Sequence, residues 1–205
     1  MTVLTSLRSR LMLTRLAAEV PLAEAPERLP EIALGGVDLA LLTTDEHSRD
    51  VQARFQELQR DFGQRVLLAI DNPRLKPDVC VPRRKIRYYR PHEWALLGRR
   101  VRDDSKLRKP DSLQFLILQD AGPESPLLRS AVEAQPPLQA GSLPWFPEGD
   151  LRPGAVEKLV RAGARRVWLT GRNPVEDLLA IDELLRDSWR EDPQEHAYRG
   201  AASIA

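Results

Sequence analysis

The sequence predicts a (β/α)8 barrel of the TIM type, a single α/β domain in which eight parallel strands alternate with helices. Short apolar runs recur along the chain, separated by segments of helical or loop character, as in a parallel sheet covered by helices. Several runs consist almost wholly of Val, Ile and Leu, which is typical of strands buried on both faces. The length of 205 residues and the hydrophobic content of 42% suit one domain with one core. We expect the barrel to span residues 1–190 and residues 191–205 to form a disordered tail.

Eight apolar runs are the candidate strands of this barrel. They are residues 10–16, 37–42, 65–70, 79–81, 97–101, 113–119, 143–146 and 167–170. We expect the middle of the barrel to be irregular, because the segment over residues 82–109 is highly charged and its predicted helices are short. Five prolines then confine any helix between residues 122 and 144 to residues 127–134.

Three helices are predicted most clearly. Residues 45–62 carry apolar side chains at helical spacing, and Gly63 ends the segment. Residues 155–162 repeat this pattern and end at Gly163. We expect the last helix to begin with Asn173 as its N-cap, followed by a proline in the first turn and an acid at the capping-box position.

Composition excludes several classes of protein. The 31 basic and 30 acidic residues nearly cancel, so the molecule as a whole has no field that would attract nucleic acid or a membrane surface. A single cysteine, Cys80, excludes an intramolecular disulfide, and we expect it to be a core thiol. Arginines interrupt the first 18 residues, no apolar stretch is long enough to span a membrane, and the three histidines lack metal-binding spacing. We expect a cytoplasmic protein with no membrane partner.

Four segments resemble motifs of one enzyme family. They are R-L-M-L-T at residues 10–14, L-G-G-V-D-L at 34–39, V-L-L-A-I-D-N at 66–72, and L-P-W-F-P-E-G-D-L at 143–151 followed by V-R-A-G-A-R-R-V at 160–167. In this order they resemble the thiamine-phosphate synthase and thiazole tautomerase superfamily, over residues 10–189. The resemblance implies a (β/α)8 barrel that joins a pyrimidine pyrophosphate to a thiazole phosphate. It also implies magnesium, which helps the pyrophosphate leave.

The chain departs from the family where the reaction needs specific groups. Basic residues are missing after the second strand, and the family's Asn-Asp after the third strand is inverted to Asp71-Asn72. Arg83 and Arg84 stand where the family has a magnesium-binding aspartate, and arginine supplies no oxygen ligand. Around Arg100 the fifth strand lacks the family's serine, threonine or histidine, and arginine cannot act as a base near neutral pH. We therefore expect no catalytic residue, no metal and no cofactor.

An anion-binding mouth is the candidate site that these departures leave. The segment over residues 83–109 holds eleven Lys or Arg and three acids, and several arginines follow predicted strands. A solvated basic surface is the plainer interpretation of this segment, and a turn with a helix cap explains the loop over residues 170–173 as well as phosphate binding does. The candidate ligand-binding residues are Asp71, Asn72, Arg83, Arg84, Arg100, Gly149, Thr170, Gly171 and Arg172.

Three functions remain open at this point. The first is a pseudoenzyme that binds a phosphorylated, thiamine-related ligand at its mouth. The second is a working enzyme of thiamine biosynthesis that uses different residues, and the third is an interaction module for protein or RNA built on the basic segment 83–109. Nucleic acid is the less favoured partner, and self-association into a homo-oligomer stays open.

Overall fold

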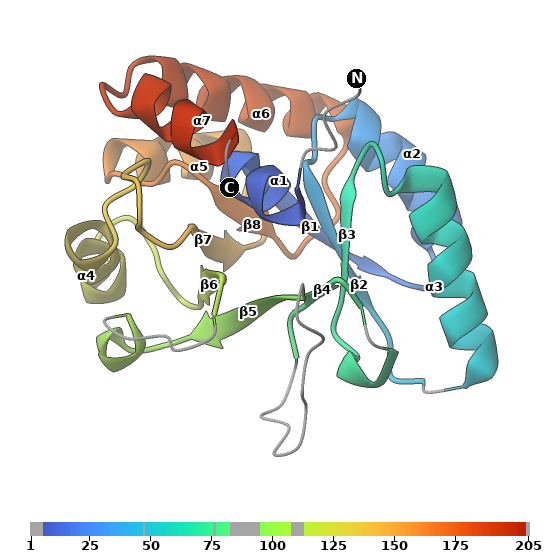
Figure 1. Ribbon diagram of the computed structural model, residues 1–205. Helices are drawn as coiled ribbons and strands as arrows, with labels where there is room; N and C mark the ends of the chain where they lie inside the picture. The colour runs from blue at the N-terminus through green and yellow to red at the C-terminus, as the bar shows by residue number, and fades with distance from the viewer. Residues whose placement is uncertain (1–5, 47, 76, 83–94, 108–112, 204–205) are drawn as a thin grey trace.

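Eight parallel strands form a closed barrel, hydrogen-bonded in sequence order from β1 to β8 and back to β1 (Figure 1). The computed structural model describes residues 6–46, 48–75, 77–82, 95–107 and 113–203. The strands are β1 (Leu16–Pro21), β2 (Leu39–Thr43), β3 (Leu67–Ile70), β4 (Val79–Cys80), β5 (Leu96–Val101), β6 (Phe115–Leu118), β7 (Trp145–Gly149) and β8 (Val167–Leu169). The predicted (β/α)8 fold is confirmed, and every predicted run from residues 37–42 onward overlaps a strand.

The first predicted strand is wrong. Of residues 10–14, which resemble the family's opening strand, residues 10–13 lie in helix α1 (Leu7–Leu13) and Thr14 is its C-cap. Strand β1 follows at Leu16–Pro21. Ser6 caps this helix, because its hydroxyl accepts a hydrogen bond from the backbone N–H of Ser9 at 3.0 Å. Leu11 then packs with the barrel-interior residues at the amino ends of the strands. The apolar run is therefore one face of a short helix that covers the bottom of the barrel.

Helices cover the outside of the barrel, as in Figure 1. They are α2 (Ala25–Leu34), α3 (Arg49–Phe62), α4 (Pro126–Ala134), α5 (Pro153–Arg161) and α6 (Val175–Arg190), with 3-10 turns η1 (Pro73–Leu75) and η2 (Asp104–Lys106) in the middle of the chain. The helices predicted at residues 45–62, 127–134, 155–162 and after 173 are thus confirmed. The predicted N-cap of α6 is wrong, because Pro174 holds that position. Buried Asn173 instead accepts a hydrogen bond from Arg152 Nη1 at 3.1 Å.

The predicted disordered tail contains helix α7 (Glu195–Ser203), which lies beside α1 (Figure 1). Tyr198 is 2% exposed and packs edge-on against Trp189 at 5.9 Å between ring centroids. Arg166, 3% exposed, donates to Tyr198 Oη and to the carbonyl oxygens of Met12 and Thr14, each at 2.9 Å. The expectation of disorder was wrong because Tyr198 and the buried Arg166 cation hold α7 in place. Such contacts produce no repeating apolar pattern in the sequence.

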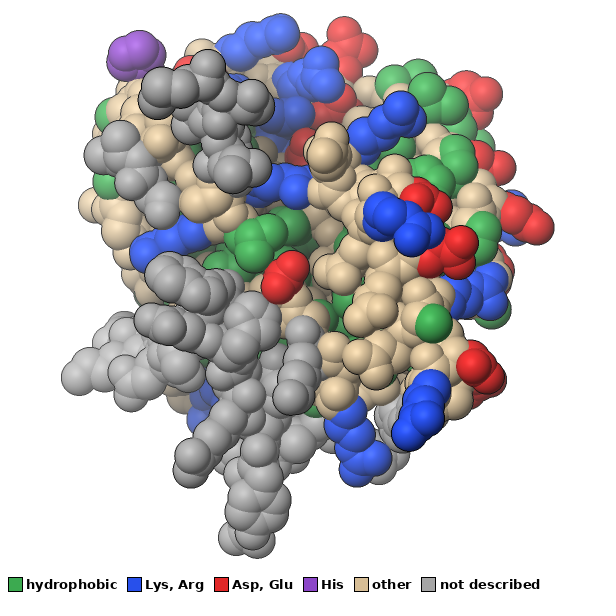
Figure 2. Space-filling model, turned by 45° about the vertical axis from the view of Figure 1, so that its right-hand side comes forward, with side chains coloured by type: hydrophobic (Ala, Val, Ile, Leu, Met, Phe, Trp, Pro, Cys, Tyr) green, Lys and Arg blue, Asp and Glu red, His purple; other side chains and the backbone are tan. Residues whose placement is uncertain are grey.

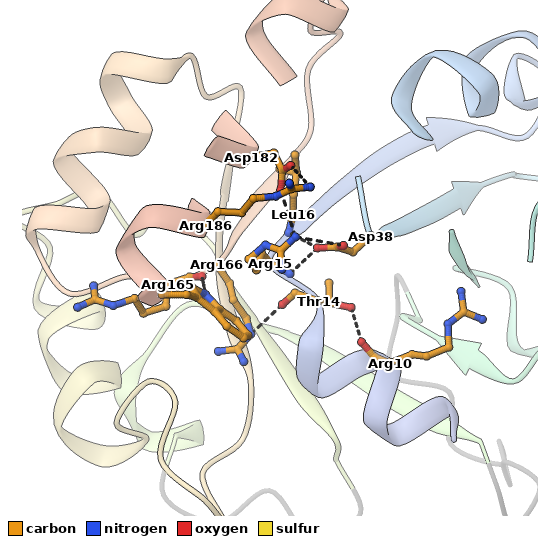
Figure 3. Close-up of polar contacts among 10 residues, drawn as sticks. Arg10, Thr14, Arg15, Leu16, Asp38, Arg165, Arg166, Asp182 and Arg186 are labelled. Atoms are coloured by element: carbon orange, nitrogen blue, oxygen red, sulfur yellow. Dashed lines mark hydrogen bonds and ion pairs between the residues drawn. The ribbon is translucent and has the colours of Figure 1, made fainter. Parts of the chain in front are cut away.

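A second arginine ties strands β1 and β2 to helix α6 at the same end of the barrel (Figure 3). Arg15 Nη2 lies 3.3 Å from Asp182 Oδ1 and 3.9 Å from Asp38 Oδ1. Asp38 Oδ2 also accepts the backbone N–H groups of Arg15 and Leu16, at 2.7 and 3.2 Å. This network lies at the amino-terminal face, where conserved features of such barrels serve stability rather than chemistry.

The Asp38 carboxyl makes stability depend on pH. Burial raises its pKa above the ordinary 3.8, and Arg15 and the two backbone N–H groups only partly oppose this. The folded chain then binds this proton more tightly than the unfolded chain, so the group's contribution to stability falls as pH rises through the raised pKa. Urea unfolding should show Asp38→Asn gaining stability relative to the native chain as pH rises from the ordinary pKa of 3.8 through the raised pKa. Exposed Asp61→Asn is the control, and a gap between Asp38→Asn and the native chain that stays constant would contradict the prediction.

The barrel interior is filled by apolar side chains with an aromatic cluster on β6, β7 and β8. Phe115 and Trp168 stack at 6.2 Å between centroids, and Phe146 contacts both edge-on, at 6.2 and 5.8 Å. Gly98 makes room for this cluster, since a Cβ there would lie 2.2 Å from Phe115 Cζ. The interior is therefore a packed core, and the groups available for ligands lie above it, at the carboxyl ends of the strands.

Candidate functional site

The interior layer above the aromatic cluster is charged. Side chains alternate along each strand, so Glu19 on β1, Arg100 on β5 and Glu148 on β7 point into the barrel two residues beyond Ala17, Gly98 and Phe146. Arg100 lies between the two carboxylates: its Nε donates to Glu148 Oε2 at 3.0 Å and its Nη2 donates to Glu19 Oε1. These three side chains, all from non-adjacent strands, close the top of the barrel core.

Two neutral side chains complete this layer. Gln119, directly after β6, donates to Glu148 Oε1 at 2.8 Å, and the indole N–H of Trp168 donates to Glu19 Oε1 at 3.0 Å. The side chains of Glu19, Arg100 and Glu148 are 21%, 19% and 13% exposed. Partial exclusion of water strengthens such pairs relative to surface ion pairs. We call Glu19, Arg100, Gln119, Glu148 and Trp168 the mouth network; its charges sum to −1.

The mouth network changes the interpretation of Arg100. The sequence predicted an arginine open to an anionic ligand, and the structure places it inside the mouth with two carboxylates already bound to it. Glu19, Gln119 and Trp168 were not predicted as site residues. The signal for Glu19 was a lone acid within an apolar strand, and the misplaced first strand concealed it.

Asp71 and Asn72 lie at the end of β3 and are 5% and 4% exposed. Asp71 Oδ1 accepts the backbone N–H of Thr44 at 3.2 Å. Asn72 accepts the N–H of Arg74 at 3.1 Å and donates to the carbonyl of Glu46 at 3.4 Å. These bonds tie the β2–α3 loop to the end of β3, so both side chains have a structural role in the described chain.

The remaining predicted residues of the described chain lie at the end of β7 and on the loop after β8. Gly149 ends β7 and its carbonyl accepts the N–H of Thr170 at 3.0 Å, while Thr170 and Arg172 are exposed. The Asp150 carboxylate leans over Gly171, where a Cβ would lie 2.0 Å from Asp150 Oδ1. The two loops therefore approach closely, with a carboxylate between them. Arg83 and Arg84, and much of the basic segment 83–109, lie outside the described residues.

The two helices that follow these loops differ at their amino ends. α5 has Arg152 as N-cap, no side-chain cap hydrogen bond and no acid in its first turn. α6 carries Glu176 and Asp177 in its first turn, and Asp177 pairs with Arg152 at 3.0 Å. The partial positive charge of a helix amino end is thus offset by acids at α6 and remains available at α5.

A cavity of about 510 Å³ adjoins the mouth network at Glu148. It lies between the β6–α4 loop, the end of β7 and helix α5. Its lining residues are Asp120, Ala121, Gly122, Pro123, Glu148, Leu151, Ala155, Lys158 and Leu159. A mostly apolar cavity of this size with a few polar groups is typical of small-molecule sites.

The described residues do not form the magnesium site that the family resemblance implies. Among them, no three His, Cys, Asp or Glu side chains are grouped as metal ligands, and the carboxylates of the mouth network bind a guanidinium. The Cys80 thiol is buried on β4. No helix in the described ranges is both long and apolar enough to cross a bilayer. On the face shown in Figure 2, basic and acidic side chains lie interspersed.

Comparisons with known proteins show which fold this chain shares with solved structures. Neither a protein-family model nor a curated protein sequence matches the chain. Thiamine phosphate pyrophosphorylase from Pyrococcus furiosus is similar in structure, with a TM-score of 0.64 and 12% identity over 89% of this chain and 99% of that one. (S)-3-O-geranylgeranylglyceryl phosphate synthase from Thermoplasma acidophilum, in complex with substrate sn-glycerol-1-phosphate, has a TM-score of 0.52 and 13% identity over 88% and 96%. A designed cube-shaped protein cage gives 0.63 and 13% over 94% and 79%. The chain has the TIM-barrel fold that these enzymes share.

Proposed function

We propose that this protein is a non-catalytic barrel of the thiamine-phosphate synthase type that binds a phosphorylated small molecule at its mouth. The observation that carries the proposal is the mouth network, in which Arg100 is held between Glu19 and Glu148 at the place where barrel enzymes perform chemistry. A general acid or base must be able to reach the proton it transfers. Here the central carboxylates are committed to a permanently charged guanidinium, which favours a structural role for them.

The loops after β7 and β8 support a phosphate as the ligand's anionic group. Barrels of this fold often bind phosphate there, at backbone N–H groups and a helix amino end. The α5 amino end has no acid in its first turn, and exposed Arg172 lies on the facing loop. Asp150 occupies the space above Gly171, so we place the phosphate on the α5 side. One structural neighbour is a thiamine phosphate pyrophosphorylase and another holds sn-glycerol-1-phosphate, which makes phosphate esters the first ligands to test.

Thermal unfolding of the full chain with phosphate, pyrophosphate and thiamine phosphate tests the proposal. A ligand that binds only the folded chain stabilises it by about 2.7 kcal/mol at 100 times its Kd, which raises Tm by several degrees. Arg172→Ala should weaken this shift, since the side chain is exposed and its loss leaves the fold intact. Arg190→Ala, an exposed arginine on α6, is the matched control.

Two outcomes would contradict the proposal separately. Absence of any shift with all three ligands would exclude the binding function. Formation of thiamine phosphate from thiazole phosphate and pyrimidine pyrophosphate with magnesium would exclude the non-catalytic assignment and favour a working enzyme. The molar mass of the same sample, measured by light scattering, would show whether the chain self-associates. The designed cage of fused symmetric oligomeric domains resembles this chain in fold alone.

A further inference from the structure

We infer that the cavity between the β6–α4 loop and helix α5 binds a positively charged amino group carried on a flat, apolar body. The inference deepens the proposed function and rests on it in one respect: the same ligand carries the phosphate. It would define the ligand as a zwitterion, a phosphate ester with a protonated amine. The argument comes from the walls of the cavity, from its two carboxylates and from its one lysine.

The walls favour an apolar body. Ala121 and Pro123 from the β6–α4 loop face Leu151, Ala155 and Leu159 from α5 and the segment before it. The cavity volume of about 510 Å³ accommodates a molecule of one substituted ring. Burial of such a ring against these side chains supplies affinity but does not fix the orientation of the ligand. The polar groups of the cavity must fix this orientation.

Asp120 is the first of these groups. Its backbone is left-handed, with φ +56, a conformation that Asp and Asn adopt more readily than other side chains. Its carboxylate is exposed and makes no hydrogen bond or ion pair with any residue that the structure describes. The turn therefore presents an uncommitted negative charge at the edge of the cavity.

Glu148 is the second. Each of its oxygens accepts one hydrogen bond, Oε1 from Gln119 and Oε2 from Arg100. A carboxylate has about four acceptor positions, so each oxygen retains one for a ligand. Glu148 thus links the cavity to the mouth network, and an ammonium group placed here would offset the network's charge of −1.

Lys158 gives the cavity its polarity. It lies on α5 and, among the described residues, makes no ion pair. Two carboxylates on the side of β6 and β7 face one ammonium on α5. The amino end of α5, which has no acid in its first turn, adjoins the same cavity at Leu151 and Ala155. This arrangement matches a ligand whose amine points to Asp120 and Glu148 while its anionic group points to α5.

Three probes separate the parts of this ligand. Pyridoxamine 5′-phosphate carries a ring, an amine and a phosphate; pyridoxine 5′-phosphate replaces the amine by a hydroxyl; pyridoxamine lacks the phosphate. Isothermal titration of the full chain should show pyridoxamine 5′-phosphate binding roughly tenfold more tightly than pyridoxine 5′-phosphate, because a charge-assisted hydrogen bond replaces a neutral one. Equal affinities for these two probes, or no binding of any probe, would overturn the inference.

Asp120→Asn isolates the carboxylate. Asparagine keeps the size and the left-handed backbone of Asp120, so the variant should fold, yet it removes the charge. It should reduce the preference for the amine severalfold, because only Glu148 remains, while Glu183→Gln, which changes an exposed acid on α6 outside the cavity, should leave the preference in full. If Asp120→Asn retains the preference undiminished, the assignment of the amine to this cavity is wrong. If pyridoxamine binds as tightly as its phosphate and depends on Asp120, the amine site stands and the proposed phosphate function fails.

Discussion

Replacement of Arg100 by methionine should lower the free energy of unfolding by about 3 kcal/mol, the usual scale for removing one partner of a buried charge pair. Methionine fills similar volume but leaves Glu19 and Glu148 as two partly buried carboxylates without a cation. The two carboxylates then repel each other above the apolar core. Urea unfolding at neutral pH measures the loss. Arg99→Met, at the neighbouring exposed position on β5, is the control and should cost less than about 0.5 kcal/mol.

The origin of this loss can be separated from simple packing. If uncompensated charge is the cause, adding Glu19→Gln and Glu148→Gln to Arg100→Met should restore most of the lost stability, because neutral amides keep hydrogen-bonding capacity without repulsion. A triple variant no more stable than Arg100→Met would show that the guanidinium acts through packing alone, and the ion-pair account of the mouth would be wrong.

The mouth network is the physical reason for proposing a barrel without chemistry at its centre. An enzyme keeps its reacting groups unsatisfied until substrate arrives, at some cost in stability. Here Glu19, Arg100 and Glu148 satisfy one another in the absence of ligand. Under the proposed function, the ligand would bind beside the network, at Glu148 and at Asp120, Lys158 and Arg172, the last three of which make no ion pair with another described residue.

The sequence predicted the fold well because the period of the pattern is local. Continuous apolar runs such as β3 and β6 are recognisable within a few residues, and so are the amphipathic faces of α3 and α5. The prediction of the first strand at residues 10–16 was wrong, because periodicity over seven residues cannot distinguish a short helix from a strand. Helix α7 was not predicted because the residue that anchors it, Arg166, is 32 residues away from Tyr198 in sequence.

The site was predictable only in part, since its contacts join distant strands. Arg100 was selected from sequence, but its partners Glu19 and Glu148 lie 81 and 48 residues away. A charge balance between such positions depends on the barrel closing, which no local pattern encodes. The cavity beside Asp120 depends likewise on a loop and a helix meeting across β7. The positions of Gly149 at the end of β7 and of Thr170, Gly171 and Arg172 after β8 could be predicted, because the predicted runs overlap these strands.

Arg166→Met should cost about 3 kcal/mol or more, the largest effect expected at the amino-terminal face. Burial lowers the pKa of the Arg166 guanidinium, and three hydrogen bonds, the Asp38 charge and the rings of Trp189 and Tyr198, 4.9 and 5.4 Å from Cζ, oppose this by stabilising the cation. Methionine would leave the carbonyls of Met12 and Thr14 without this donor.

The same variant tests how α7 is anchored. Because Arg166 connects α1, β8 and α7, its loss should release α7 before the barrel unfolds, seen as faster amide exchange over residues 195–203. Tyr198→Phe removes one of the three hydrogen bonds and should cost about 1 kcal/mol. Arg190→Ala, an exposed arginine on the preceding helix, should change neither stability nor exchange. Unchanged exchange in Arg166→Met would mean that the packing of Tyr198 on Trp189 holds α7 by itself, and that the buried cation serves only the α1–β8 junction.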